Sequence, residues 1–270
     1  MVDSVGLGSS VNSALQGLQR TSQQSNQAND RLSTGLRIRD PLDGAQDFFA
    51  AQGLTNRAAD LAQVKDQVGQ AISTIQAAEV GLESINQLSD QARGLAIAAQ
   101  NTSDPAQRAQ LAEQFNQIRT QINSIAADSS FGGTNLIGGS PDNLEVPLNE
   151  DGASLTVQGT DSSSDGLGIG ARSFASDADI DAALADISSA QSQIRSNSVS
   201  LSSSTSTLQN RIDFTDSLSN TLEQGAASLT QADLNEEAAN LLSLQTRQAL
   251  GSNALTIATE NERAVLGLFG

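Results

Sequence analysis

The stretch closest in spacing to a chemical site is Asp-Ser-Ser-Ser-Asp-Gly at residues 161–166, which imitates the opening of a calcium-binding EF-hand loop. The twelfth position of such a loop needs a bidentate Glu, but here it is Arg172, and no helix–loop–helix frame surrounds it. Residues 166–170 are glycine-rich but lack the spacing and the strand-to-helix context of a nucleotide-binding loop. We therefore expect a solvated acidic loop, with no metal site and no cofactor.

The composition removes most of the side chains that carry catalysis near neutral pH. The 270 residues include no His, Cys, Trp or Tyr, so imidazole, thiolate and phenol chemistry is absent. Disulfides and zinc sites built from His or Cys are excluded for the same reason. No catalytic constellation stands out among the remaining Ser and carboxylate side chains. We expect a protein that is not an enzyme.

The charge balance and the hydropathy pattern exclude two further classes. Only 14 residues are Lys or Arg against 31 Asp or Glu, which gives a net charge of −17 and disfavours nucleic-acid binding. No window approaches the roughly 18 apolar residues of a membrane span, so we expect no membrane insertion. Residues 1–19 lack a cationic start followed by an apolar block, so we expect no cleaved secretory signal peptide.

Apolar residues recur in alternating steps of three and four over long stretches, which is the pattern of packed helices. The stripes persist over many turns without a break, which favours long rods over a compact globule. We expect three such helices, the first two of them antiparallel neighbours because only a short connection near residues 101–103 separates them. The predicted rod core is Leu61, Val64, Val68, Ile75, Leu82, Ile85, Phe115, Ile118, Ile122, Ile187, Ile194, Leu201 and Leu208.

Local signals mark where these helices begin and end. Asp104 and Pro105 offer an N-cap and a first-position proline, with Gln107 as the capping-box partner. Ser176 and Asp179 open the third rod helix in the same way. The sequence Phe-Gly-Gly at residues 131–133 is expected to end the second helix.

One β-hairpin is expected in the middle of the chain. Residues 144–148 and 153–158 alternate apolar and polar side chains, and they flank an Asp-Gly turn signal at 151–152. Pro147 would confine its strand to an edge. With helices before and after the hairpin, the simplest architecture is an elongated rod with the hairpin far from both termini.

Both ends of the chain carry narrow apolar stripes that are too weak to form stable helices alone. We expect these two arms to pair with each other as a coiled coil, with neighbouring copies supplying the remaining contacts. The residues expected at these contacts are Val11, Leu15, Leu18, Leu32, Leu234, Leu241, Leu250, Leu255, Ile257 and Leu268.

Three motifs carry a resemblance to a known family. Residues 30–38 read Asp-Arg-Leu-Ser-Thr-Gly-Leu-Arg-Ile, residues 131–136 read Phe-Gly-Gly-Thr-Asn-Leu, and residues 233–239 with 244–250 form a C-terminal signature. Together they resemble bacterial flagellin, the subunit of the flagellar filament, over nearly the whole chain. Where many members of that family read Lys-Asp-Asp-Ala-Ala, residues 42–46 of this chain read Leu-Asp-Gly-Ala-Gln.

The resemblance implies a division of the chain. Both ends would form a terminal coiled-coil domain, a short spoke would follow, and a rod domain would carry the hairpin. The short central segment leaves no room for the outer domains of longer relatives. The implied bounds are 1–34 and 226–270 for the terminal arms, 35–47 for the spoke, 48–137 and 176–225 for the rod helices, and 138–175 for the hairpin and its loop.

The function implied by the resemblance is a structural subunit that self-assembles into an extracellular filament for swimming motility. Implied partners are other copies of the chain, the flagellar export apparatus, an export chaperone, the filament cap and the hook-junction proteins. Two alternatives remain at this stage: a hook–filament junction protein, which shares the N-terminal half, and a secreted coiled-coil binding module outside the flagellum.

The resemblance also identifies a segment that an animal innate receptor recognises in many flagellins. Aligned without gaps, Arg93 and Leu95 match the family pattern, whereas Gln91 replaces an arginine and Gly94 replaces a glutamate. Two charged partners would be lost. We expect weak activation of that receptor.

Overall fold

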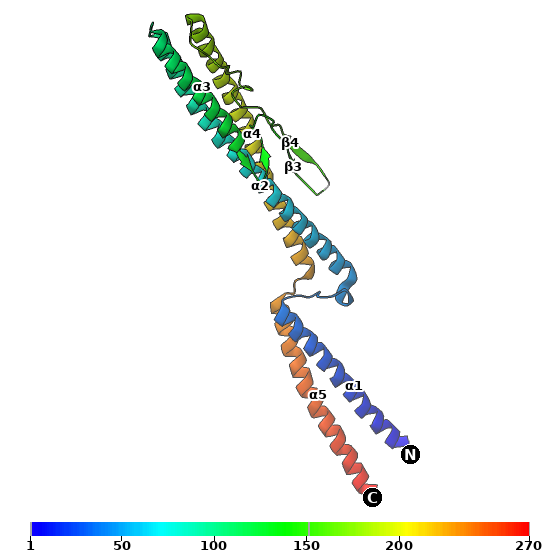
Figure 1. Cartoon of the computed structure of the whole chain (residues 1–270). Coiled ribbons are helices and arrows are strands. Elements are labelled where there is room, and N and C mark those ends of the chain that lie inside the picture. Colours follow the sequence, from blue (N-terminus) through cyan, green and yellow to red (C-terminus); the bar gives the residue numbers. More distant parts are fainter. Residues whose placement is uncertain (1, 151, 270) are drawn as a thin grey trace. The chain divides into compact units, whose positions relative to one another are not determined.

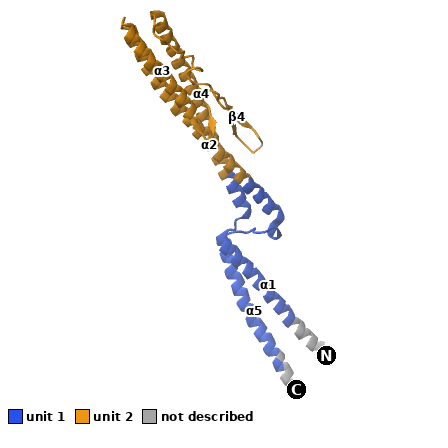
Figure 2. Ribbon diagram, viewed as in Figure 1, with its two compact units in different colours: residues 1–56, 221–270 blue, residues 57–220 orange. Residues whose placement is uncertain are grey.

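The computed structural model describes residues 2–150 and 152–269, with side-chain environments for residues 11–150, 152–261 and 263–264. The chain divides into two compact units, which Figure 2 colours separately. The central unit is Arg57–Asn220, and the terminal unit combines Met1–Asn56 with Thr221–Gly270. The terminal unit therefore brings together segments from the two ends of the sequence.

Long helices make up most of the described chain (Figure 1), which confirms the predicted mainly α fold. Helices α2 and α4 each contribute residues to both units, whereas α3 lies entirely in the central unit and α1 and α5 in the terminal unit. Their bounds are Val2–Thr34 for α1, Pro41–Gln100 for α2, Pro105–Asp128 for α3, Asp177–Thr230 for α4 and Leu234–Phe269 for α5.

In the central unit, α2, α3 and α4 pack around one apolar core. Helix α3 turns back along α2 after residues 101–104, so the two helices are antiparallel neighbours as expected (Figure 1). Full burial of a large apolar side chain contributes about 1.5–3 kcal/mol relative to exposure, so this seam supplies much of the unit's stability. The structure buries every residue of the predicted rod core: Leu61, Val64, Val68, Ile75, Leu82, Ile85, Phe115, Ile118, Ile122, Ile187, Ile194, Leu201 and Leu208.

The start of α3 follows the predicted capping signal. Asp104 has an extended backbone, its carboxylate accepts a hydrogen bond from the backbone N–H of Ala106, and Pro105 takes the first helical position. The side chain of Gln107 accepts from the hydroxyl of Thr102 rather than from the backbone of the cap residue. The prediction of Gln107 as the capping-box partner was therefore wrong, because the backbone N–H of Asp104 donates to the hydroxyl of Thr102 instead.

The expectation for Phe131 and the two glycines after it was wrong. Helix α3 already ends at Asp128, and the two glycines form the tight turn of a small hairpin between β1 (Ser130–Phe131) and β2 (Thr134–Asn135). Gly132 and Gly133 have φ angles of 59° and 87°, the positive values that a two-residue hairpin turn of this kind requires. The described chain therefore contains two antiparallel hairpins rather than the one expected.

The second hairpin is the predicted one. Strands β3 (Leu144–Pro147) and β4 (Ser154–Val157) pair antiparallel, with Leu144 opposite Val157 and Pro147 opposite Ser154. Val146 and Val157 point into the core of the central unit. The hairpin therefore adds apolar side chains to the seam between the helices.

In the terminal unit, α1 and α5 lie side by side and run antiparallel (Figure 1). Small or short side chains line the contact: Ser25 and Ala28 of α1 are buried, and a Cβ on Gly251 of α5 would lie 3.1 Å from Leu18 Cδ1. Leu244 of α5 is buried in the same unit. The predicted pairing of the two arms is thus present in the structure.

The segments that join these arms to α2 and α4 are bound to each other. Leu36 forms an antiparallel bridge with Gln231, and the Arg37 backbone N–H donates to the Thr230 carbonyl at 2.7 Å. Gly35, with a φ of 71°, ends α1 and accepts from the Ala232 N–H at 2.9 Å. This bridge holds the end of α1 beside the end of α4.

The predicted spoke, residues 35–47, is only partly extended. Helix α2 begins at Pro41, because proline is pre-organised for the first helical position and the Asp40 carboxylate accepts from the Leu42 N–H. Gly44 interrupts the helix with φ 171° and ψ 90°. The proposed domain bounds at 34, 47, 137, 175 and 225 stay predictions.

Candidate assembly surfaces

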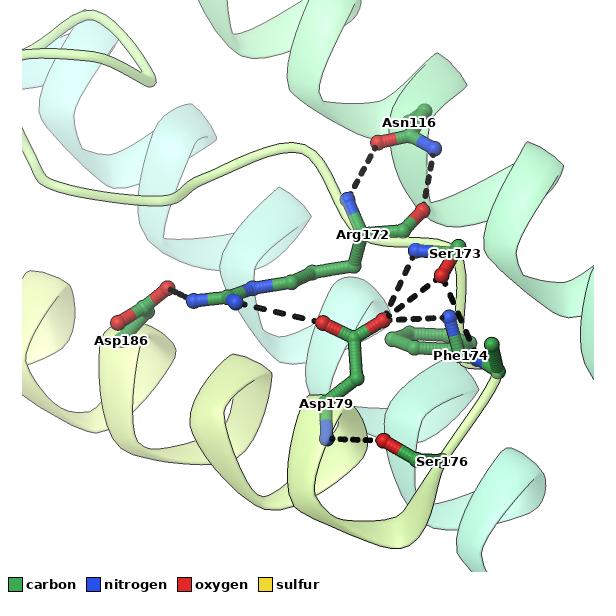
Figure 3. A network of polar contacts seen from close by, with 8 residues as sticks. Asn116, Arg172, Ser173, Phe174, Ser176, Asp179 and Asp186 are labelled. Carbon is green, nitrogen blue, oxygen red and sulfur yellow. Dashed lines mark hydrogen bonds and ion pairs between the residues drawn. The ribbon is translucent and has the colours of Figure 1, made fainter.

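A polar network fixes the loop that leads into α4 (Figure 3). The Asp179 carboxylate accepts from the backbone N–H groups of Ser173 and Phe174, at 3.0 and 2.8 Å, and from the Ser173 hydroxyl. The Arg172 guanidinium donates to both Asp179 and Asp186. The side chain of Asn116 on α3 both accepts from the Arg172 N–H and donates to its carbonyl.

These contacts explain the electrostatics of Asp179. Burial alone would raise its pKa, but the hydrogen bonds from Ser173 and Phe174 and the pairing with Arg172 outweigh burial and lower the pKa below its usual value. The same network holds Phe174 at a φ of 53°, which is uncommon for a residue with a side chain. The Phe174 ring is buried against Phe115, with centroids 5.3 Å apart. The network therefore holds the loop before α4 in place.

In the loop that imitates an EF hand, the carboxylates of Asp161 and Asp165 form contacts with other groups of the same chain. Asp161 accepts from the Ser163 N–H at 2.9 Å, and Asp165 pairs with Arg119 of α3 at 3.1 Å. Arg119 also donates to the Ile169 carbonyl at 2.6 Å, which ties the loop to the core. Among the described residues, no group of three or more His, Cys, Asp or Glu is arranged to hold a metal ion.

The hairpin β3–β4 is anchored by two arginines from different helices. Arg57 Nε of α2 lies 2.6 Å from Glu150 Oε1, and Arg211 Nε of α4 donates to the Leu148 carbonyl at 2.7 Å. The Arg211 guanidinium also lies 5.0 Å from the ring centroid of Phe214. The hydrogen bonds at Glu150 from the backbone and from Arg57 lower the pKa of its carboxyl.

The arms leave apolar side chains without cover. Each helix can turn only one face to its partner, so the remaining apolar positions meet solvent. Leu15, Leu234, Leu250 and Ile257 are exposed, the last two by 64% and 59%, whereas Val11, Leu18, Leu32, Leu241 and Leu255 are half-buried. Leu268 lies outside the residues whose side chains are described.

Leu244, Leu242 and Leu42 are among the apolar residues of the terminal unit that the sequence analysis missed. Leu244 is buried. It lies three residues after Leu241, on the same face of the helix, so the spacing could have identified it. Leu242 and Leu42 are exposed, and nothing in the apolar periodicity of the sequence singles them out.

The segment aligned with the innate-receptor pattern lies on α2 in the central unit. Gln91, Arg93 and Gly94 are exposed, and Leu95 is half-buried against the core. A Cβ added to Gly94 would meet nothing within 4 Å. The altered positions therefore face outward and are free to contact another molecule.

Comparison with known proteins decides the family. Flagellin FljM of Caulobacter vibrioides is 31% identical over 99% of both chains, and flagellin FljN of the same organism is 32% identical over the same share. The chain belongs to the flagellin family. Residues 9–142 match the profile of the bacterial flagellin N-terminal helical region, and a flagellin of Brucella melitensis is 28% identical over 97% of both chains.

The fold of this flagellin is also found in a solved structure. The crystal structure of Bacillus cereus flagellin superposes with a TM-score of 0.50, covering 55% of this chain and 88% of that one, at 20% identity. The predicted family is thus confirmed, including the short form, because the Caulobacter relatives match this flagellin over nearly their whole length. The flagellin family is a family of structural proteins.

Proposed function

We propose that this chain is the structural subunit of a bacterial flagellar filament and acts by self-assembly, without catalysis. The observation that supports the proposal most directly is the pairing of α1 and α5 with apolar side chains left exposed on the pair, Leu250 and Ile257 among them. A single chain cannot cover them. Neighbouring copies presenting the same arms can.

The physical basis of assembly is repetition of a contact that does not close on itself. When one surface of a subunit binds a different surface of the next, the contact repeats without limit and generates a helical polymer. The binding free energy of each contact can be small, because the same contact repeats along the whole filament. In such a filament the chain would carry torque through packed helices and would need no reactive group.

The location and partners follow from membership of the family. The filament would lie outside the cell, and the chain would be exported through the flagellar export apparatus with an export chaperone. The filament cap and the hook-junction proteins would be its other partners. No helix among the described residues has the length and hydropathy needed to cross a membrane.

Electron microscopy of the purified, concentrated chain tests the proposal. We expect long filaments of uniform diameter, together with a swimming defect when the gene is deleted. Discrete rods that never elongate would contradict it and would favour the hook–filament junction protein or the secreted binding module. A cell lacking the chain that still builds normal filaments would show that another subunit suffices.

A further inference from the structure

One leucine of the terminal unit is almost fully exposed at the start of α2. Leu42 has 96% of its surface accessible, and it follows Pro41 in the first helical turn. The Asp40 carboxylate accepts from the Leu42 N–H at 2.8 Å, and the Asp43 carboxylate accepts from the Arg39 N–H at 3.1 Å. These bonds fix the turn that presents the side chain, so Leu42 is a protruding residue on an ordered backbone.

Gly44 completes this arrangement. A Cβ at Gly44 would lie 3.1 Å from Ile38 Cδ1, and Ile38 is buried. The non-helical backbone at Gly44 therefore allows the first turn of α2 to fold closely over Ile38 and separates it from the remainder of the helix. Leu42 is held away from the apolar residues of its own unit.

The same unit contains an apolar groove of about 330 Å³. Its walls come from the connecting segment, from α2 and from the end of α4, and its rim carries Arg39 and Glu223. The space is larger than a leucine side chain. The apolar residues that line it are Leu36, Ile38, Phe48, Ala51, Ala226 and Ala227.

The chain does not fill this groove with its own Leu42, which is not among the lining residues. The groove rim carries one cation, Arg39, and one carboxylate, Glu223. Asp40 and Asp43 flank the leucine, and each uses one carboxylate oxygen in the bonds above. Among the described residues, the Arg39 guanidinium at the groove forms no hydrogen bond or ion pair. The apolar walls suit a leucine side chain, and the Arg39 guanidinium beside Glu223 offers a cation to one of the flanking carboxylates.

We propose that Leu42 of one subunit inserts into the groove of a neighbouring copy, with the neighbour's free arginine at the rim facing the incoming carboxylates. The partner is a second copy of this chain, because both halves of the contact lie on one unit and every copy carries both. The proposal rests on the proposed filament function and names one contact within it. Each subunit in the polymer would provide one leucine and receive another.

Disulfide trapping tests the contact directly, because the chain has no cysteine of its own. Two single variants, Leu42→Cys and Ala227→Cys, are mixed, polymerised and oxidised. A disulfide needs Cα atoms within about 7 Å, so only close apposition gives a cross-linked pair. We expect a dimer whose peptides join positions 42 and 227. The matched control pairs Leu42→Cys with Ser228→Cys, an exposed neighbour outside the groove.

Assembly itself gives the second measurement. Leu42→Gln should raise the critical concentration for filament growth by about tenfold or more, since burial of a leucine is lost. The thermal unfolding of the monomer should stay unchanged because the side chain is already exposed. Leu42→Met, which keeps an apolar side chain of similar size, should assemble nearly as the parent chain does.

The outcomes separate this contact from the filament function. If filaments form but the 42–227 cross-link does not exceed the 42–228 control, or if Leu42→Gln assembles normally, the contact is wrong and the filament function stands. If the cross-link forms only in discrete dimers, the contact stands and the filament function is wrong. If the parent chain does not polymerise and the mixed cysteine variants give no 42–227 cross-link, both are wrong.

Discussion

Arg31 of α1 and Glu237 of α5 form an ion pair that joins the two ends of the sequence, with Nη1 3.6 Å from Oε1. The Glu237 side chain is only 12% exposed, and the Glu237 backbone N–H donates to the Asp233 carbonyl at 2.9 Å in the first turn of α5. Arg31→Glu leaves a mostly buried carboxylate next to a second negative charge, and we expect it to weaken arm pairing by roughly 1–3 kcal/mol.

The charge swap makes this prediction specific. Arg31→Glu combined with Glu237→Arg should recover most of the lost helicity and filament assembly, measured by circular dichroism and electron microscopy. Arg20→Glu, an exposed change on the same helix, should have little effect on pairing. Failure of the double variant to recover would show that the ion pair does not hold the arms together.

Two glycines of α2 should respond to alanine in opposite directions. A Cβ at Gly81 would lie 2.6 Å from Ile137 Cδ1 and would also clash with Ser129, so we expect Gly81→Ala to destabilise the central unit by about 1–3 kcal/mol. Gly94→Ala meets open space and should stabilise it by about 0.5–1 kcal/mol. Thermal and urea unfolding of both variants measures the change in the stability of the central unit. Equal effects would contradict the packing at Gly81.

The lowered pKa of Asp179 predicts an acid-sensitive loop. Because the folded state lowers this pKa below its unfolded value, the stabilisation is complete above the unfolded pKa, near 4, and is lost as the pH falls through the folded value. Asp179→Asn should cost roughly 2 kcal/mol at neutral pH and should flatten the loss of stability at acid pH. Urea unfolding from pH 7 to pH 2 measures both. An unchanged pH dependence in the variant would mean that other carboxylates cause the acid loss.

A carboxylate at an apolar position of α5 should block assembly and leave the core folded. Ile257→Asp or Leu255→Asp buries an unpaired charge at every repeated contact, which costs several kcal/mol. Neither residue belongs to the central unit, so its unfolding should be unchanged. Gln245→Glu, an exposed polar position on the same helix, is the control for added charge. Normal filaments from Ile257→Asp would show that this face is not an assembly surface.

Activation of the innate receptor should be weak and should rise when the missing charges are restored. Loss of one charged interface contact commonly costs 2 kcal/mol or more, about 30-fold in affinity. Gln91→Arg with Gly94→Glu places both charges on exposed positions of α2. Reporter cells that carry the receptor should respond more strongly to this double variant than to the parent chain. A parent chain already as potent as a flagellin with the full motif would refute the prediction.

Periodicity and capping signals predicted the helices well, because both act within a few residues of the chain. The stripe through Leu61, Ile75 and Leu82 is buried, and α3 begins at Pro105 after the Asp104 cap. The hairpin at 144–157 was equally readable, because strand alternation and the turn signal are local. The glycine pair at 132–133 was misread, since the same residues suit a helix end and a hairpin turn.

The sequence by itself determined the mainly α fold, the pairing of the arms and the family. Only the tertiary structure decided which side chains of each arm face the partner helix and which meet solvent, as with half-buried Leu255 and exposed Ile257. It also decided that Arg172 pairs with Asp179 and Asp186. Contacts between residues on different elements depend on how those elements pack. The exposure of Leu42 has the same cause, because the residue type does not say whether the fold covers the side chain.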